Sequence, residues 1–129
     1  MRHAVIVCHR GACLSAPENT LASLAGAIDM GAEVVEFDVR PSRDGVLYVM
    51  HDATVDRTTD GTGRFADMTS DEIDTLDAGS WFSPEFAGER VPRLNTFLDA
   101  CRGGGSWPMP KSRKAIRRKY VTCWPSGAC

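Results

Sequence analysis

The chain has 129 residues, of which 43% are apolar and 25% charged, a composition typical of one globular domain. It contains no run of about 18 apolar residues, and its first apolar segment leads into His9-Arg10-Gly11 instead of a small-residue cleavage site. We therefore expect a soluble, unexported, cytoplasmic protein. The five cysteines are odd in number and include no Cys-x-x-Cys pair, which favours reduced thiols over a disulfide framework or a zinc knuckle.

The net charge of -2 conceals two regions of opposite charge. Residues 1–102 hold 9 arginines and 17 acids, whereas residues 103–129 hold 6 basic residues and no acid. This change predicts a boundary at the glycine triplet 103–105, followed by a basic tail that is either disordered or translated out of frame. We expect no nucleic-acid partner, because a basic run is usually a solvated surface; a patch for nucleic acid or an anionic membrane is the alternative.

The first elements in chain order are a strand, a helix and a strand. Residues 4–8 form a short β-branched run, typical of a strand buried on both faces. Helical spacing of apolar residues predicts a helix over residues 18–30, with Gly31 as its stop. Residues 33–39 predict a second strand. Such a unit is a parallel crossover, the repeat of barrels and doubly wound sheets, and it indicates an α/β fold.

A turn at Asp44-Gly45 then separates the second strand from an extended run at residues 46–50, which predicts a hairpin ending at His51. Residues 53–92 are rich in Thr, Asp and Gly and indicate an insertion or long loop.

Two more helices are expected in the remainder of this region. A short one is predicted over residues 70–76, where Thr69 or Ser70 can serve as the N-cap. Residues 94–101 have the apolar spacing of a helix that ends near the glycine triplet.

Side chains suited to catalysis follow the predicted strands. His9 and Arg10 come after the first strand, and His51 comes after the third. Glu36 and Asp38 are two residues apart on the second strand, so they project from the same face. In a parallel barrel these strand ends form a single active-site face.

The two carboxylates of the second strand admit two interpretations. Buried without a partner, Glu36 and Asp38 would cost several kcal/mol, which favours a cation between them. Oxygen ligands select a hard ion, so Mg²⁺ or Ca²⁺ is expected. Alternatively, both acids face water on an edge strand, and the nearby Glu33 shows that the segment tolerates acidic residues.

His9 and His51 could each be packed histidines, and Arg10 alone indicates nothing. Their coincidence with two carboxylates favours a common site. A cation and a guanidinium can neutralise phosphoryl oxygens, while one imidazole takes a proton from the nucleophile and the other protonates the leaving alkoxide. The residues therefore predict metal-assisted cleavage of a phosphate ester.

The motifs of the chain, in order and spacing, resemble those of glycerophosphodiester phosphodiesterases over about residues 4–101. The motifs that carry this resemblance are His9-Arg10-Gly11, Pro17-Glu18-Asn19-Thr20-Leu21, Gly31-Ala32, Glu36-x-Asp38-Val39, Asp44-Gly45, His51-Asp52, Asp56-Arg57-Thr58-Thr59, Gly61-Thr62-Gly63, Leu76-Asp77-Ala78-Gly79-Ser80-Trp81-Phe82 and Val91-Pro92-x-Leu94.

The resemblance implies a (β/α)8 TIM barrel, which needs about 250 residues when complete. Residues 1–102 would be its N-terminal part, with the family's insertion at about residues 53–92, and the barrel would be incomplete. The implied activity is metal-dependent hydrolysis of a small-molecule glycerophosphodiester to an alcohol and sn-glycerol 3-phosphate, a step of glycerophospholipid metabolism.

The resemblance also assigns roles by position. His9 and His51 would be the acid–base pair, Arg10 the phosphate clamp, and Glu36 and Asp38 ligands of a divalent cation. The family's counterpart of His51 also lies near the metal in some members, which leaves its role open.

Three further residues would support the site, namely Glu18 and Asn19 by orienting it and Asp52 by fixing His51. The family's third acidic ligand has no counterpart after Arg102, where the chain has no acid.

This departure leaves two alternatives to an active enzyme of this type. One is an inactive fragment that binds phosphodiesters or a partner chain, and the other is a related phospholipase that acts on intact lipid. The uncovered strand edges of an incomplete barrel also predict self-association.

Overall fold

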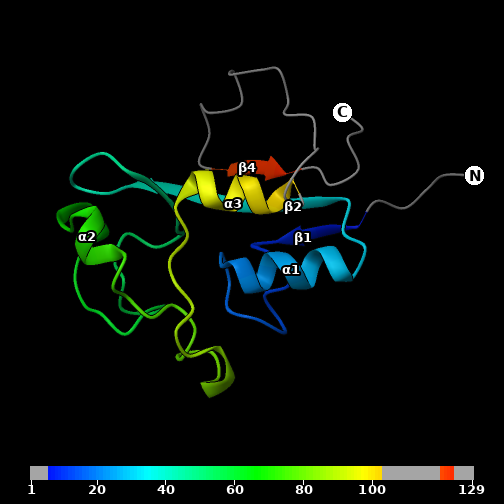
Figure 1. The fold of residues 1–129 in the computed structure, drawn as a ribbon, viewed down its shortest axis with the longest axis horizontal. Helices are drawn as coiled ribbons and strands as arrows, with labels where there is room; N and C mark the ends of the chain where they lie inside the picture. Colours follow the sequence, from blue (N-terminus) through cyan, green and yellow to red (C-terminus); the bar gives the residue numbers. More distant parts are fainter. Residues whose placement is uncertain (1–5, 103–119, 124–129) are drawn as a thin grey trace, which may run out of the picture.

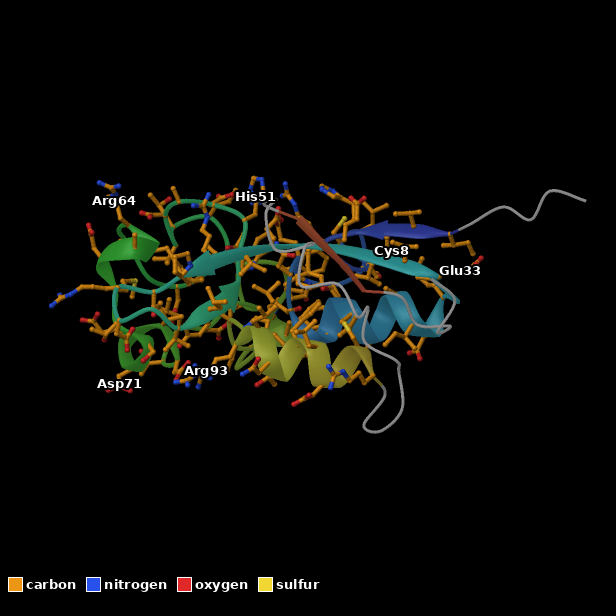
Figure 2. The ribbon with its side chains drawn as sticks, turned by 90° about the horizontal axis from the view of Figure 1, so that it is seen from above. Cys8, Glu33, His51, Arg64, Asp71 and Arg93 are labelled. Carbon is orange, nitrogen blue, oxygen red and sulfur yellow. The ribbon has the colours of Figure 1, made fainter. Side chains whose placement is uncertain are left out.

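The computed structural model describes residues 6–102 and 120–123. A small sheet forms one layer, and two helices, α1 and α3, lie together on one of its faces (Figure 1; Figure 2). The sheet is open, as expected for an incomplete barrel. Among the described residues, no helix has the length and apolar character needed to cross a membrane.

The first three elements form the predicted parallel crossover. Strand β1 (Val7–His9) pairs in parallel with β2 (Val34–Pro41), and α1 (Leu21–Asp29) connects them. The register places His9 opposite Glu36. The helix begins later than residue 18 because Asn19 has a left-handed backbone and Thr20 is the N-cap, whose side chain forms a capping box with Ser23.

The hairpin is also confirmed. Strand β3 (Leu47–Val49) pairs antiparallel with the end of β2, and Val39 lies opposite Val49. It is shorter than the predicted run at residues 46–50, although the amide of Met50 still donates to the carbonyl of Asp38 on β2 at 2.9 Å.

Strand β4 (Tyr120–Cys123) differs from the expectation of a tail without regular structure. It pairs antiparallel with residues 35–38 of β2. The sequence Tyr-Val-Thr-Cys is aromatic and β-branched, which suits a strand. The other residues of the basic tail lie outside the described residues, and the boundary at residue 103 stays a prediction.

The insertion is more ordered than a long loop. It contains α2 (Ser70–Ile73) and two 3-10 turns, η1 (Phe65–Asp67) and η2 (Pro84–Phe86). Thr69 caps α2 in a capping box with Glu72, but the helix ends three residues before the predicted end. The predicted helix over residues 94–101 is confirmed as α3 (Leu94–Cys101).

Two separate apolar clusters stabilise these regions. The barrel core lies between β1, β2, α1 and α3, and includes Leu24, Val35, Phe37 and Phe97. The insertion core contains Tyr48, Met50, Val55, Phe65, Ile73, Leu76, Ala78 and Val91. Because Val35 and Phe37 point toward the helices, alternation along β2 directs the residues between and beyond them to the opposite face of the sheet.

Candidate active site at the strand ends

The turn at residues 17–20 is held against the end of β1 by backbone contacts. The amide of Asn19 donates to the carbonyl of Arg10 at 3.0 Å, and the amide of Arg10 donates to the carbonyl of Glu36 at 2.7 Å. Arg10 and Asn19 both have a φ of 56°, in the left-handed region. Such a conformation costs about 1–3 kcal/mol per residue and persists where its surroundings fix it. These backbone hydrogen bonds therefore hold Arg10 and Asn19 in a left-handed conformation at the end of β1.

Asp38 lies at the centre of this arrangement, on the face of β2 turned away from the helices. It is only 5% exposed. Asn19 Nδ2 donates to Asp38 Oδ2 at 3.2 Å, and Arg10 Nε lies 3.4 Å from the same oxygen. Glu36, half-buried, lies two residues earlier on that face. The predicted water-exposed alternative is therefore wrong for Asp38.

Two buried polar atoms beside Asp38 have no hydrogen-bond partner among the described residues. They are Arg10 Nε, which is close enough to Asp38 for an ion pair but not aligned for a hydrogen bond, and Asn19 Oδ1. Buried polar groups are normally satisfied. An unpaired donor suits an anionic oxygen and an unpaired acceptor suits a cation, so the surroundings of Asp38 fit a phosphate and a hard metal ion side by side.

Glu18 links Arg10 to the insertion. Its carboxylate accepts from Arg10 Nη1 at 2.9 Å and from Arg57 Nη1 at 2.6 Å. Burial alone would raise the pKa of Glu18, but the hydrogen bonds and charges of Arg57 and Arg10 outweigh it and lower the pKa. Glu18 is therefore ionised at neutral pH and balances both guanidinium groups.

His51 and Asp52 form a second carboxylate contact, on the segment that follows β3. His51 Nδ1 lies 2.6 Å from Asp52 Oδ1, and Arg57 donates to both oxygens of Asp52 at 2.8 and 2.9 Å. The hydrogen bonds from Arg57 hold the pKa of Asp52 well below its ordinary value, against partial burial and with a further contribution from His51. The contact expected between Asp52 and His51 is thus present.

A small hollow, open to solvent, lies beside these groups. Its lining residues are Glu18, Asn19, Thr20, Val49, Met50, His51, Thr58, Ala78 and Val91. Three of them, Thr58, Ala78 and Val91, come from the insertion. The motif around residues 56–59 was the available signal for this part of the site.

The contacts thus unite six of the eight predicted site residues. They run from Asp38 through Arg10 and Asn19 to Glu18, and through Arg57 to Asp52 and His51. Among the described residues, the side chains of His9 and Glu36 are not part of this series of contacts; His9 is exposed at the end of β1, in register with Glu36. Arg57 lies in the motif Asp56-Arg57-Thr58-Thr59, but the sequence alone does not indicate its contacts with Glu18 and Asp52.

No cluster of three or more acidic, histidine or cysteine side chains able to hold a metal is found within residues 6–102. Glu36 and Asp38 are two carboxylates on one face, and the Asn19 side chain, which contacts Asp38, adds an unpaired acceptor, Oδ1. The described residues therefore fit part of a cation site, and the assignment of Glu36 and Asp38 as ligands stays a prediction.

Known proteins are similar to this chain in sequence and in fold. A glycerophosphodiester phosphodiesterase of Caldanaerobacter subterraneus is 49% identical over 90 residues, which are 70% of this chain and 37% of that protein. The crystal structure of glycerophosphodiester phosphodiesterase from Agrobacterium tumefaciens matches with a TM-score of 0.77 and 55% identity, over 81% of this chain and 45% of that one.

A phosphodiesterase of Oleispira antarctica, solved in complex with the product sn-glycerol-3-phosphate, matches with a TM-score of 0.73 and 41% identity, over 75% of this chain and 39% of that one. The chain therefore spans roughly two fifths of these relatives. The sequence pattern of the glycerophosphoryl diester phosphodiesterase family matches residues 9–112. The chain belongs to the glycerophosphoryl diester phosphodiesterase family.

Proposed function

We propose that this site hydrolyses a glycerophosphodiester to an alcohol and sn-glycerol 3-phosphate. The observation that carries the proposal is the buried group Asp38–Arg10–Asn19, which has an unpaired donor and an unpaired acceptor beside a buried carboxylate. The Oleispira antarctica phosphodiesterase holds sn-glycerol-3-phosphate as its product, which supports the same product here.

The proposed reaction uses the chain's own groups for binding and proton transfer. The Arg10 guanidinium binds phosphoryl oxygens and neutralises charge that develops on them. One of His9 and His51 accepts a proton from the attacking water as its oxygen bonds to phosphorus. The other donates a proton to the leaving alkoxide as its phosphorus–oxygen bond breaks. Two such proton transfers contribute about 10²–10⁴-fold each.

A divalent cation, Mg²⁺ or Ca²⁺, is proposed to complete the site. Glu36, Asp38 and the Asn19 amide oxygen would hold it, and when bound it would polarise a phosphoryl oxygen. Asp38 shares its carboxylate with Arg10 and Asn19, so those contacts fix the carboxylate's direction. Glu18 is proposed to orient Arg10, and Asn19 is proposed to orient Asp38.

The proposed compartment is the cytoplasm, and the proposed partner is the small substrate together with a second copy of the chain. The odd number of cysteines and the lack of a Cys-x-x-Cys pair in the sequence favour reduced thiols, which supports a reducing compartment. Val7 on β1 is 52% exposed and would be covered in an associated form. Cell fractionation tests the compartment, and sedimentation across a concentration series tests the association; a monomer at all concentrations would exclude it.

Activity of the full 129-residue chain decides the main proposal. The purified chain is assayed for release of glycerol 3-phosphate from glycerophosphocholine, with and without a chelator. We expect metal-dependent release that His9→Ala lowers by about 10²-fold or more. Asp71→Asn, at an exposed position on α2 away from His51, is the matched control (Figure 2). Folded chain without turnover would contradict the proposal and favour the inactive fragment.

A further inference from the structure

Arg57, which was not among the predicted site residues, contacts two of them, Asp52 and Glu18. Its guanidinium donates through Nε and Nη2 to the two oxygens of Asp52, at 2.8 and 2.9 Å. It also donates through Nη1 and Nη2 to the two oxygens of Glu18, at 2.6 and 3.2 Å. One side chain from the insertion therefore joins the segment after β3 to the turn before α1.

The planar guanidinium is suited to this position. Its five N–H groups lie in a fixed plane and can face two carboxylates at once, whereas a lysine ammonium acts as a point charge. Arg57 is 46% exposed, and an exposed ion pair alone contributes little stability. Its contribution is therefore geometric: it fixes where Glu18 and Asp52 lie relative to each other.

That geometry determines which nitrogen of His51 carries the proton. Asp52 is held as a carboxylate, which can only accept hydrogen bonds. The 2.6 Å contact therefore requires His51 Nδ1 to be the donor, which leaves Nε2 of the neutral ring without a proton. If Asp52 turned away, either nitrogen could be protonated.

We infer that Arg57 is a positioning residue that locks Asp52 in place and thereby keeps the proton of neutral His51 on Nδ1. Nε2 is then the nitrogen available for proton exchange with water or substrate. The inference rests on the proposed role of His51, but the arrangement can be measured without turnover. Through Arg57, the insertion would then set the protonation of a histidine at the strand ends.

The experiment is ¹⁵N NMR of the histidine side chains in the full chain at alkaline pH, with the His51 signals identified by their loss in His51→Gln. The wild-type chain is expected to show the Nδ1–H form almost alone. In Arg57→Ala we expect the Nδ1–H and Nε2–H forms to come within about threefold of each other. Arg57→Lys keeps a charge but cannot face both carboxylates, so an intermediate result is expected.

Arg93→Ala is the matched control. Arg93 is 45% exposed and forms an ion pair with Asp74, but it lies on the opposite side of the molecule from His51 (Figure 2). The control should keep the wild-type form. The inference is overturned if Arg57→Ala keeps the Nδ1–H form, or if Arg93→Ala disturbs it equally. Should Arg57→Ala fail to fold, Arg57→Lys is measured instead, and a wild-type proportion of the Nδ1–H form in that variant would overturn the inference. Loss of turnover alone would bear on the proposed function and not on this assignment.

Discussion

The barrel part and the insertion reach stability by different means. The barrel core is formed by regular strands and helices, and Phe37 and Phe97 contact each other with ring centroids 4.7 Å apart. The insertion core is enclosed by short turns whose polar groups are satisfied by aspartates. Asp77, for example, accepts from the amides of Gly79, Ser80 and Gly88. Regular pairing positions the strands that carry the candidate site, and side-chain hydrogen bonds shape the loop beside them.

The site lies where these two regions meet. Arg10, Asp38 and Glu18 come from the barrel part, whereas Arg57 and part of the hollow come from the insertion. The barrel part is thus expected to fold without the insertion core, but the site is expected to need both. The following changes test that difference.

The largest expected effect is the loss of a core aromatic from either region. Phe97→Ala and Phe65→Ala each remove a ring that is at most 1% exposed, and each is expected to lower the free energy of unfolding by about 3–5 kcal/mol. Hydrogen exchange then separates the regions. In Phe65→Ala the amides of β2 and α1 should stay protected while those of α2 do not. Equal loss of protection everywhere would show one cooperative core.

Gly11→Ala should cost less, but it acts directly on the barrel side of the site. Gly11 has a φ of 81°, and an added Cβ would lie 2.8 Å from Ser23 Cβ, where no Cβ fits. We expect a loss of about 2–3 kcal/mol in urea unfolding. Gly45→Ala is the control, since its φ of 85° gives the strain without any close atom, at a cost of about 1 kcal/mol. Equal effects would show that strain alone matters at Gly11.

Particular residues show how far the sequence could predict this arrangement. Alternation along β2 predicted that Glu36 and Asp38 project from one face, and the structure turns that face away from the core residues Val35 and Phe37. The Asp44-Gly45 signal correctly predicted the hairpin. The contact of Arg57 with Glu18 spans 39 positions and depends on how the insertion folds, so no local pattern contains it. The insertion core was missed because its apolar residues are spread among Thr, Asp and Gly without strand or helix periodicity.

Lowering the pH should weaken the junction between the two regions. The pKa values of Asp52 and Glu18 are lowered in the folded chain, so their contribution is complete above the unfolded values of about 4. It is lost as the pH falls from about 4 toward the folded values. The melting temperature should therefore drop more steeply between pH 5 and 3 in the wild type than in Asp52→Asn. Parallel slopes would contradict a stabilising carboxylate at the junction.

The smallest expected effect concerns a second link between the regions. Glu89, in the insertion, accepts through Oε1 from the amide of Ala22, in the first turn of α1, at 3.0 Å. A negative charge there is favourable because the amides of the first turn have no acceptor one turn earlier in the helix and the positive end of the helix dipole lies there. Glu89→Gln keeps an acceptor but removes the charge, so we expect a loss of about 0.3–1 kcal/mol in urea unfolding, reduced by added salt. Glu85→Gln, at an exposed position in η2, is the control with the same chemical change. A larger loss in Glu89→Gln, unaffected by salt, would mean that the geometry of this contact, and not its charge, holds the insertion against α1.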